Sequence, residues 1–148
     1  MKINNIKDPC ISKETFEQAR FVHNKLSYEK WVDYIDKHQD YFIWEDDTPD
    51  GIYRRNNIAK IPEWAREGIL NSYKSKAFAE FNVKKGWYEI VFEFHKDLGI
   101  ITTTFQKPIN KKHLLTLLDL ANYLDALLLK DGKEIIDENV IKALEQAE

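Results

Sequence analysis

An acidic and aromatic stretch between positions 29 and 53 holds the side chains best suited to recognition. Carboxylates steer and pair with a positively charged surface, and aromatic rings supply the buried area of an interface. We therefore predict a binding surface for a cationic protein partner. Its predicted residues are Asp33, Asp36, Asp40, Trp44, Glu45, Asp46, Asp47, Asp50 and Tyr53. The alternative is a charged helix face followed by a turn, with Trp44 in the core.

Glu89, Glu93 and His95 form the grouping most like a metal site. They recur at even spacing in a segment that alternates polar and apolar residues. Alternate residues of a β-strand point to the same face of a sheet, where carboxylates and an imidazole could coordinate a divalent cation. The solvent-facing side of an ordinary antiparallel sheet shows the same alternation and is the simpler interpretation.

A second chemical hypothesis places His95 beside the threonine run 102–104 of the following strand. A histidine base next to hydroxyl groups could cleave RNA without a metal. The segment 100–105, with the sequence IITTTF, resembles a strand of bacterial ribonuclease toxins. Threonine is also common in ordinary antiparallel strands. The alternative to a binding protein is therefore a small metal-dependent or metal-free hydrolase or ribonuclease that uses the mixed sheet face around His95.

The charge balance argues against direct nucleic-acid binding. The 148 residues carry 22 Lys and Arg against 25 Asp and Glu, a net charge of −3. A nuclease needs a cationic groove to hold the phosphate backbone, and only Arg54, Arg55, Lys60 and Arg66 could supply one. The five glycines are scattered, so no glycine-rich phosphate loop is present and no cofactor is expected.

The single cysteine, Cys10, excludes an intramolecular disulfide and fits a reducing compartment. The amino terminus lacks the apolar core of a secretion signal. The longest apolar stretch, residues 114–129, is too short to span a bilayer and contains Asp119 and Asp125. We therefore expect a cytoplasmic protein that makes no membrane contact.

The first half of the chain is predicted to be helical around one short strand. Residues 1–11 show no period and are expected to form a loose arm. Helical spacing of apolar residues predicts one helix over 12–26 and a second one capped by Ser27. The remaining predicted elements are a strand over 41–44, a polar loop over 47–51 and a helix over 62–73 with Trp64 facing inward.

The second half predicts an antiparallel meander followed by a long helix. Alternation with period two predicts strands over 77–83, 87–95 and 100–106. A leucine-rich helix is expected over 110–130 and must meet a further element, either the last helix after Asp137 or a second copy in a homodimer. The predicted fold is one α+β domain over residues 1–148, a meander of three to four antiparallel strands packed against a long C-terminal helix, with N-terminal helices.

The chain is similar in general type to bacterial immunity proteins, which neutralise a toxin by covering its basic active site. The features that carry this resemblance are small size, acidic charge, a single cysteine, an α+β pattern and one acidic patch around Glu45, Asp46, Asp47 and Asp50. The resemblance implies a non-enzymatic, protein-binding function with a cationic toxin as the partner.

Overall fold

Alternating apolar residues build the middle of the sheet in the computed structural model, which describes residues 2–147. Strands β3 (Lys76–Asn82), β4 (Trp87–His95) and β5 (Ile100–Phe105) lie where alternation predicts them. Neighbouring strands are antiparallel, with Phe92 opposite both Ala77 and Thr103. Apolar residues of these strands, such as Ile90, Phe92 and Phe94, are buried, whereas Glu93 and His95 between them are partly exposed.

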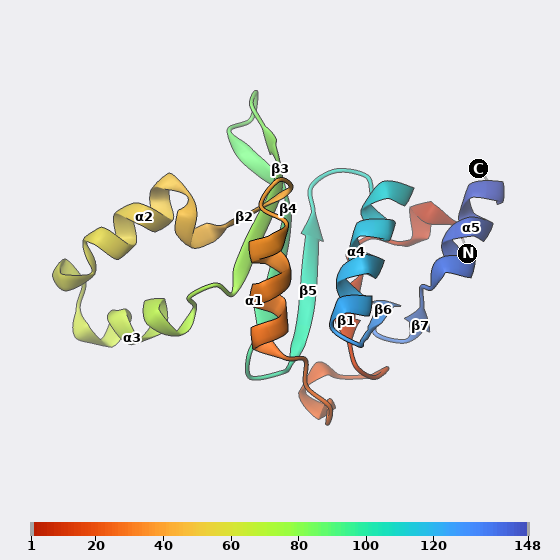
Figure 1. Ribbon diagram of the computed structural model, residues 1–148, viewed down its shortest axis with the longest axis horizontal. Helices are drawn as coiled ribbons and strands as arrows, with labels where there is room; N and C mark the ends of the chain where they lie inside the picture. Colours follow the sequence, from red (N-terminus) through yellow and green to blue (C-terminus); the bar gives the residue numbers. More distant parts are fainter. Residues whose placement is uncertain (1, 148) are drawn as a thin grey trace.

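These three strands are only the centre of a seven-stranded antiparallel sheet (Figure 1). The strand order is β2-β3-β4-β5-β1-β6-β7, with β2 (Phe42–Trp44) and β7 (Glu134–Ile135) at the two edges. The prediction of a three- to four-stranded meander against a long C-terminal helix is therefore wrong. Both edge strands are very short, which limits edge-to-edge pairing with other chains.

The predicted helix over 110–130 ends early, because the leucine run divides into a helix and a strand. Helix α4 (Lys111–Tyr123) stops before Asp125, whose φ of 53° is left-handed. Strand β6 (Leu127–Lys130) follows and pairs with β1 (Cys10–Ser12). A leucine-rich run suits a buried strand as well as a helix, so only the pairing with β1 decides between them.

The amino-terminal segment is a structural part of the sheet. Strand β1 lies between β5 and β6, and Ile11 is fully buried. The prediction of a loose arm over 1–11 is therefore wrong for the residues that enter the sheet. The helix predicted over 12–26 is also wrong, because the segment holds only the 3₁₀ turn η2 (Ala19–Phe21) beyond β1. A second 3₁₀ turn, η1 (Ile3–Asn5), precedes β1.

Helices α1 (Tyr28–Lys37) and α4 lie over one face of the sheet (Figure 1), and α5 (Glu138–Ala147) packs against α4. Ser27 caps α1 by accepting a hydrogen bond from the backbone N–H of Lys30, as its sequence predicts. The core between helices and sheet includes Trp31, Phe92 and Leu117. Within residues 2–147, no helix has the length and apolar character needed to cross a bilayer.

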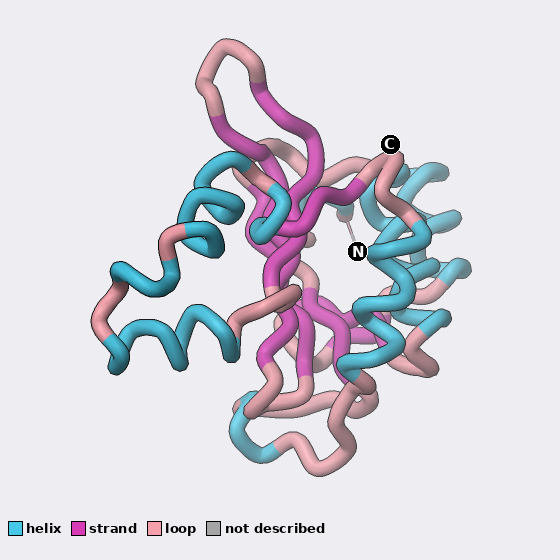
Figure 2. Tube along the Cα trace, turned by 60° about the vertical axis from the view of Figure 1, so that its left-hand side comes forward, coloured by secondary structure: helices cyan, strands magenta, loops and turns pink. Residues whose placement is uncertain are grey.

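Residues 45–73 form a helical arm beside the edge strand β2. The arm contains η3 (Glu45–Asp47), α2 (Pro49–Asn56), η4 (Ile58–Lys60) and α3 (Glu63–Asn71). Figures 1 and 2 show it standing clear of the strands. The predicted polar loop over 47–51 is instead the start of α2, which Thr48 caps. Trp64 is 84% exposed, so its predicted inward orientation is wrong.

Candidate functional site

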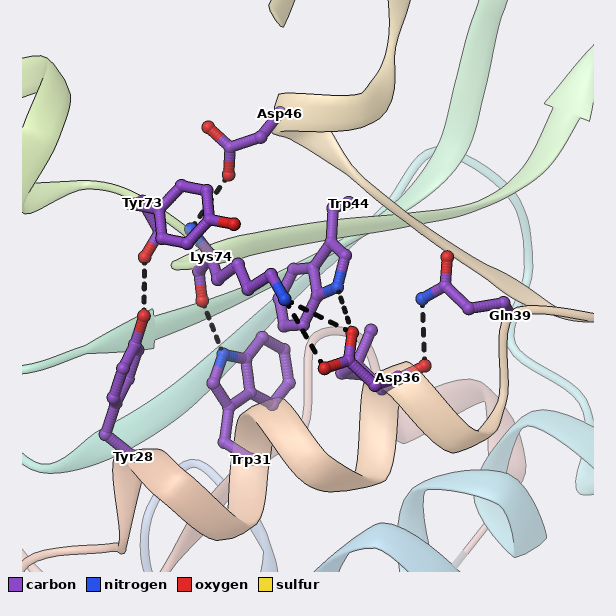
Figure 3. A network of polar contacts seen from close by, with 9 residues as sticks. Tyr28, Trp31, Asp36, Gln39, Trp44, Asp46, Tyr73 and Lys74 are labelled. Carbon is purple, nitrogen blue, oxygen red and sulfur yellow. Dashed lines mark hydrogen bonds and ion pairs between the residues drawn. The ribbon is translucent and has the colours of Figure 1, made fainter.

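The arm is joined to the sheet by a polar network around Lys74 (Figure 3). The backbone N–H of Lys74 donates to the Asp46 carboxylate at 2.8 Å, and its carbonyl accepts from the Trp31 indole at 2.8 Å. The Tyr28 hydroxyl donates to the neighbouring carbonyl of Tyr73. Lys74 has a φ of 52°, so these contacts hold the chain in a conformation that costs energy for a residue with a side chain.

Asp36 completes this network from helix α1. Its carboxylate accepts from the Trp44 indole at 2.8 Å and pairs with the Lys74 ammonium at 3.4 Å. Trp44 is only 1% exposed, which makes it a core residue and not part of a surface. Two of the predicted partner-binding acids, Asp36 and Asp46, thus have a structural role at the base of the arm.

Three further acids of the predicted surface have basic partners in the same chain. Glu45 lies 3.6 Å from Arg54, and Asp47 lies 3.8 Å from Arg55. Asp33 pairs with Lys37 at 2.9 Å and accepts a hydrogen bond from the Tyr123 hydroxyl. Hydrogen bonds from Tyr123 and then Lys37 lower the pKa of Asp33.

The remaining predicted residues are outward-facing. Asp40 and Asp50 are exposed and have no hydrogen-bond or ion-pair partner within the described part of the chain, and Tyr53 is 70% exposed. Asp40 lies beyond the end of α1, whereas Asp50 and Tyr53 lie on α2. The acids are therefore distributed between the arm and the α1 side of the sheet and do not form one patch.

A partly buried polar cluster that the sequence did not predict surrounds Glu80 of β3. The Glu80 carboxylate accepts from the Tyr41 hydroxyl at 2.6 Å and from His113 at 2.7 Å, and it pairs with Lys107 at 2.7 Å. Burial raises the pKa of Glu80, but the hydrogen bonds from Lys107, Tyr41 and His113 outweigh it and lower the pKa to about 2. The sequence signal that was available is Asn110, which caps α4 and donates its backbone N–H to His113.

A cleft opens beside this cluster, between the end of α1, the start of β2 and α4. It has a volume of about 400 Å³. A neighbouring cavity of about 300 Å³ reaches Glu80 and shares Tyr41, Lys112 and Thr116 with the cleft. The cleft is lined by Tyr34, His38, Asp40, Tyr41, Phe42, Lys112, Leu115, Thr116 and Asp119.

The metal site predicted from Glu89, Glu93 and His95 does not form. Glu89 is 7% exposed and accepts a hydrogen bond from the Asn82 amide. Glu93 lies 3.8 Å from His95, but these two residues have no third ligand. Across residues 2–147, no group of three His, Cys, Asp or Glu side chains is arranged to hold a metal ion.

His95 does meet a threonine hydroxyl, as the second chemical hypothesis expects. His95 Nε2 lies 2.7 Å from Thr102 Oγ1 across the β4–β5 pair. Thr103 points elsewhere and donates to the carbonyl of Pro9. Glu93 and His95 also line a shallow cavity of about 460 Å³, which includes Lys96. The arrangement places a hydroxyl, an imidazole and a carboxylate in a row.

Comparison with known proteins found no matching protein family, no similar curated protein and no similar solved structure.

Proposed function

We propose that this protein is a non-enzymatic protein-binding module that docks on a cationic partner, as an immunity protein docks on the basic active site of a toxin. The observation that carries the proposal is the exposure of two aromatic rings on the arm, Trp64 at 84% and Tyr53 at 70%. Interface hot spots are enriched in Trp and Tyr, because these rings bury a large area while losing little conformational entropy.

The network around Lys74 supports this role, because it fixes the base of the arm. An interface element binds more tightly when its conformation is set before the partner arrives. Trp31 and Asp36 of α1 and Asp46 of η3 all bind Lys74, so the arm is held at its junction with β3.

The acids of the arm are compatible with a cationic partner despite their internal ion pairs. The pairs of Glu45 with Arg54 and Asp47 with Arg55 are long and solvent-accessible. Pairs of this kind contribute about 0–1 kcal/mol. Basic groups of a partner can therefore replace Arg54 and Arg55 at small cost, while Asp50 is exposed without a partner of its own among the described residues.

The test is a binding measurement with the purified product of the adjacent reading frame, since a toxin and its immunity protein are expected to be encoded together. Replacing both Tyr53 and Trp64 by alanine should weaken binding about a thousandfold, because each hot-spot ring contributes about 2 kcal/mol. Phe21→Ala is the matched control, since Phe21 is also an exposed aromatic residue, at 60%, but belongs to η2 and not to the arm.

Calorimetry gives the affinity, and circular dichroism checks that the variants fold. The proposal is wrong if the Tyr53 and Trp64 variant binds the partner as tightly as the wild type does. In a second arm of the experiment, Asp47→Asn with Asp50→Asn should slow association and reduce its dependence on salt, because rim charges act mainly on the association rate.

A second candidate function is metal-free hydrolysis at His95, and the contact with Thr102 favours it. His95 Nε2 lies 2.7 Å from Thr102 Oγ1, and Nδ1 is the nitrogen nearer to Glu93; a neutral imidazole that carries its proton on Nδ1 has Nε2 as an acceptor. An imidazole held in this way can accept a proton from a hydroxyl nucleophile. In RNA, that nucleophile is the ribose 2′-hydroxyl: its proton passes to the imidazole, its oxygen bonds to the adjacent phosphorus to give a 2′,3′-cyclic phosphate, and the 5′-oxygen leaves and takes a proton from water.

This candidate is tested with purified protein, single-stranded RNA and a chelator in the buffer. Cleavage that His95→Ala abolishes and that Thr102→Ala weakens would support it. The control is Thr104→Ala, because Thr104 is exposed on the same strand and makes no side-chain hydrogen bond within the described residues. If RNA cleavage is absent, or is unchanged in His95→Ala, the hydrolase is excluded.

A further inference from the structure

The hydroxyl groups that line the cleft between α1, β2 and α4 all donate within the described part of the chain. The Tyr34 hydroxyl donates to Asp119 at 2.9 Å, and the Tyr41 hydroxyl donates to Glu80 at 2.6 Å. The Thr116 hydroxyl donates to the carbonyl of Lys112 at 3.0 Å. Each of these oxygens keeps a lone pair that can still accept a hydrogen bond.

The His38 ring likewise has one N–H donor that is already engaged within the chain. Its Nδ1 lies 2.7 Å from the carbonyl of Tyr34, and because a carbonyl only accepts, Nδ1 carries the proton. In the neutral imidazole, Nε2 is then an acceptor. The ring is fixed in place because it stacks on Tyr34, with the ring centroids 4.0 Å apart.

The two tyrosines keep their protons, so they remain donors to the carboxylates. Burial raises the pKa of Tyr34, and the hydrogen bond to Asp119 raises it further. Burial and the hydrogen bond to Glu80 raise the pKa of Tyr41 in the same way. The two tyrosine hydroxyls therefore keep donating to Asp119 and Glu80 across the neutral range.

The charges that face the cleft favour a cation. Asp40 and Asp119 are exposed carboxylates, and Lys112 is the only lysine or arginine among the described residues that line the cleft. Lys112 is exposed and makes no ion pair with any described residue, so its ammonium can turn toward solvent. The ligand that fits must therefore supply several N–H donors and a positive charge.

We propose that the cleft binds the guanidinium group of an arginine side chain presented by the protein partner. This inference rests on the proposed function, because it supplies the chemistry by which a cationic partner would be recognised. A guanidinium has five N–H donors in one plane and no acceptor. These donors match the acceptor oxygens and the one imidazole nitrogen that line the cleft. An ammonium has only three donors and no planar fork, so lysine fits less well.

The direct test is an NMR titration of the full chain with the peptide acetyl-Gly-Arg-Gly-amide. We expect saturable shifts of the His38 ring signals and of the Tyr34 and Tyr41 side chains. The matched probe has citrulline in place of arginine, which keeps the shape but loses the charge. It should bind at least about tenfold more weakly, since a hydrogen bond to a charged group is worth about 1.5–3 kcal/mol.

The variant Asp40→Asn with Asp119→Asn should weaken binding of the arginine peptide by about tenfold or more. Asp125→Asn is the control, because Asp125 lies outside the cleft and asparagine tolerates its left-handed backbone. Lys112→Ala should strengthen binding, because it removes the competing cation and leaves Asp40 and Asp119 in place. Folding of each variant is read from the unperturbed backbone signals.

The inference is overturned if the citrulline peptide binds equally well, if the Asp40 and Asp119 variant binds like the wild type, or if the cleft signals do not move. Free L-arginine amide that binds as tightly as a series of longer arginine peptides would point to a small metabolite and overturn the assignment to a protein partner. These titrations do not involve the arm, so their failure is distinguishable from a failure of the Tyr53 and Trp64 experiment.

Discussion

Glu80 combines an unusual backbone with a partly buried charge. Its φ of 59° places a residue with a side chain in the left-handed region. Glu80 lies within strand β3, and the residues before and after it, Ala79 and Phe81, both pair with β4. Such a conformation costs about 1–2 kcal/mol. Three hydrogen-bonding partners, Tyr41, Lys107 and His113, hold the carboxylate toward α4 and offset that cost.

Replacing Glu80 by glutamine should lower the free energy of unfolding by about 1–3 kcal/mol at neutral pH, because a neutral amide satisfies fewer of these donors. The effect should depend on pH. The pKa of Glu80 falls from an ordinary 4.5 to about 2 in the folded state, so its stabilisation is complete above pH 4.5 and is lost as the pH falls toward 2. Urea unfolding across this range measures the difference between variant and wild type.

Glu63→Gln is the control for Glu80, since Glu63 is exposed and should change stability by less than about 0.5 kcal/mol. A difference between Glu80→Gln and the wild type that stays constant from neutral pH to pH 2 would contradict the account of Glu80 as a charged hub.

At the scale of elements, the acids near the arm differ sharply in what they do. Asp36 accepts from the buried Trp44 indole, whereas Asp47 forms only a 3.8 Å pair with Arg55 at the surface. Both belong to the same acidic run in the sequence. Their different partners arise because α1 packs against the sheet while η3 and α2 belong to the arm.

Asp36→Ala should therefore destabilise the protein by about 1–3 kcal/mol, because the Trp44 indole loses its acceptor. Asp36→Asn, which keeps an acceptor oxygen, should recover part of this loss. Asp47→Ala is the matched control and should cost at most about 1 kcal/mol. Thermal unfolding followed by tryptophan fluorescence measures the stability of all three variants. Equal losses for Asp36→Ala and Asp47→Ala would contradict the structural role of Asp36.

At the scale of the whole molecule, the strand nearest the amino terminus joins the two parts of the sheet. Strand β1 pairs with β5 through Ile11 and with β6 through all three of its residues. Removing residues 2–12 should leave β5 and β6 without a common neighbour, and we expect cooperative unfolding to be lost. Removing residues 2–5 alone keeps Ile6 and β1 and should preserve cooperativity, as calorimetry can show.

The possibility of a homodimer is a separate question at this scale. Leu114, Leu117 and Leu120 of α4 are buried within one chain, and α5 is the further element that α4 contacts. We therefore expect a monomer, with the same sedimentation coefficient at two concentrations about twentyfold apart. A sedimentation coefficient that rises with concentration would support a homodimer instead.

The sequence by itself determined the local structure wherever period and cap agree. Alternation located β3, β4 and β5, and Ser27 located the start of α1. It also singled out His95 and the threonines of the next strand, because neighbouring strands joined by a tight turn bring nearby residues together. These features depend on contacts close in the chain.

Only the tertiary structure decided what depends on distant partners. Residues 10–12 become a strand because β5 and β6 bracket them, and the leucine run divides because Leu128 and Leu129 pair with that strand. The cluster around Glu80 likewise unites residues from the turn before β2, from β3 and from α4. The acids of the binding prediction hold the base of the arm, form surface ion pairs or line the cleft, according to the element beside each one. A carboxylate's role is set by the donor that folding places next to it, and no local pattern records that donor.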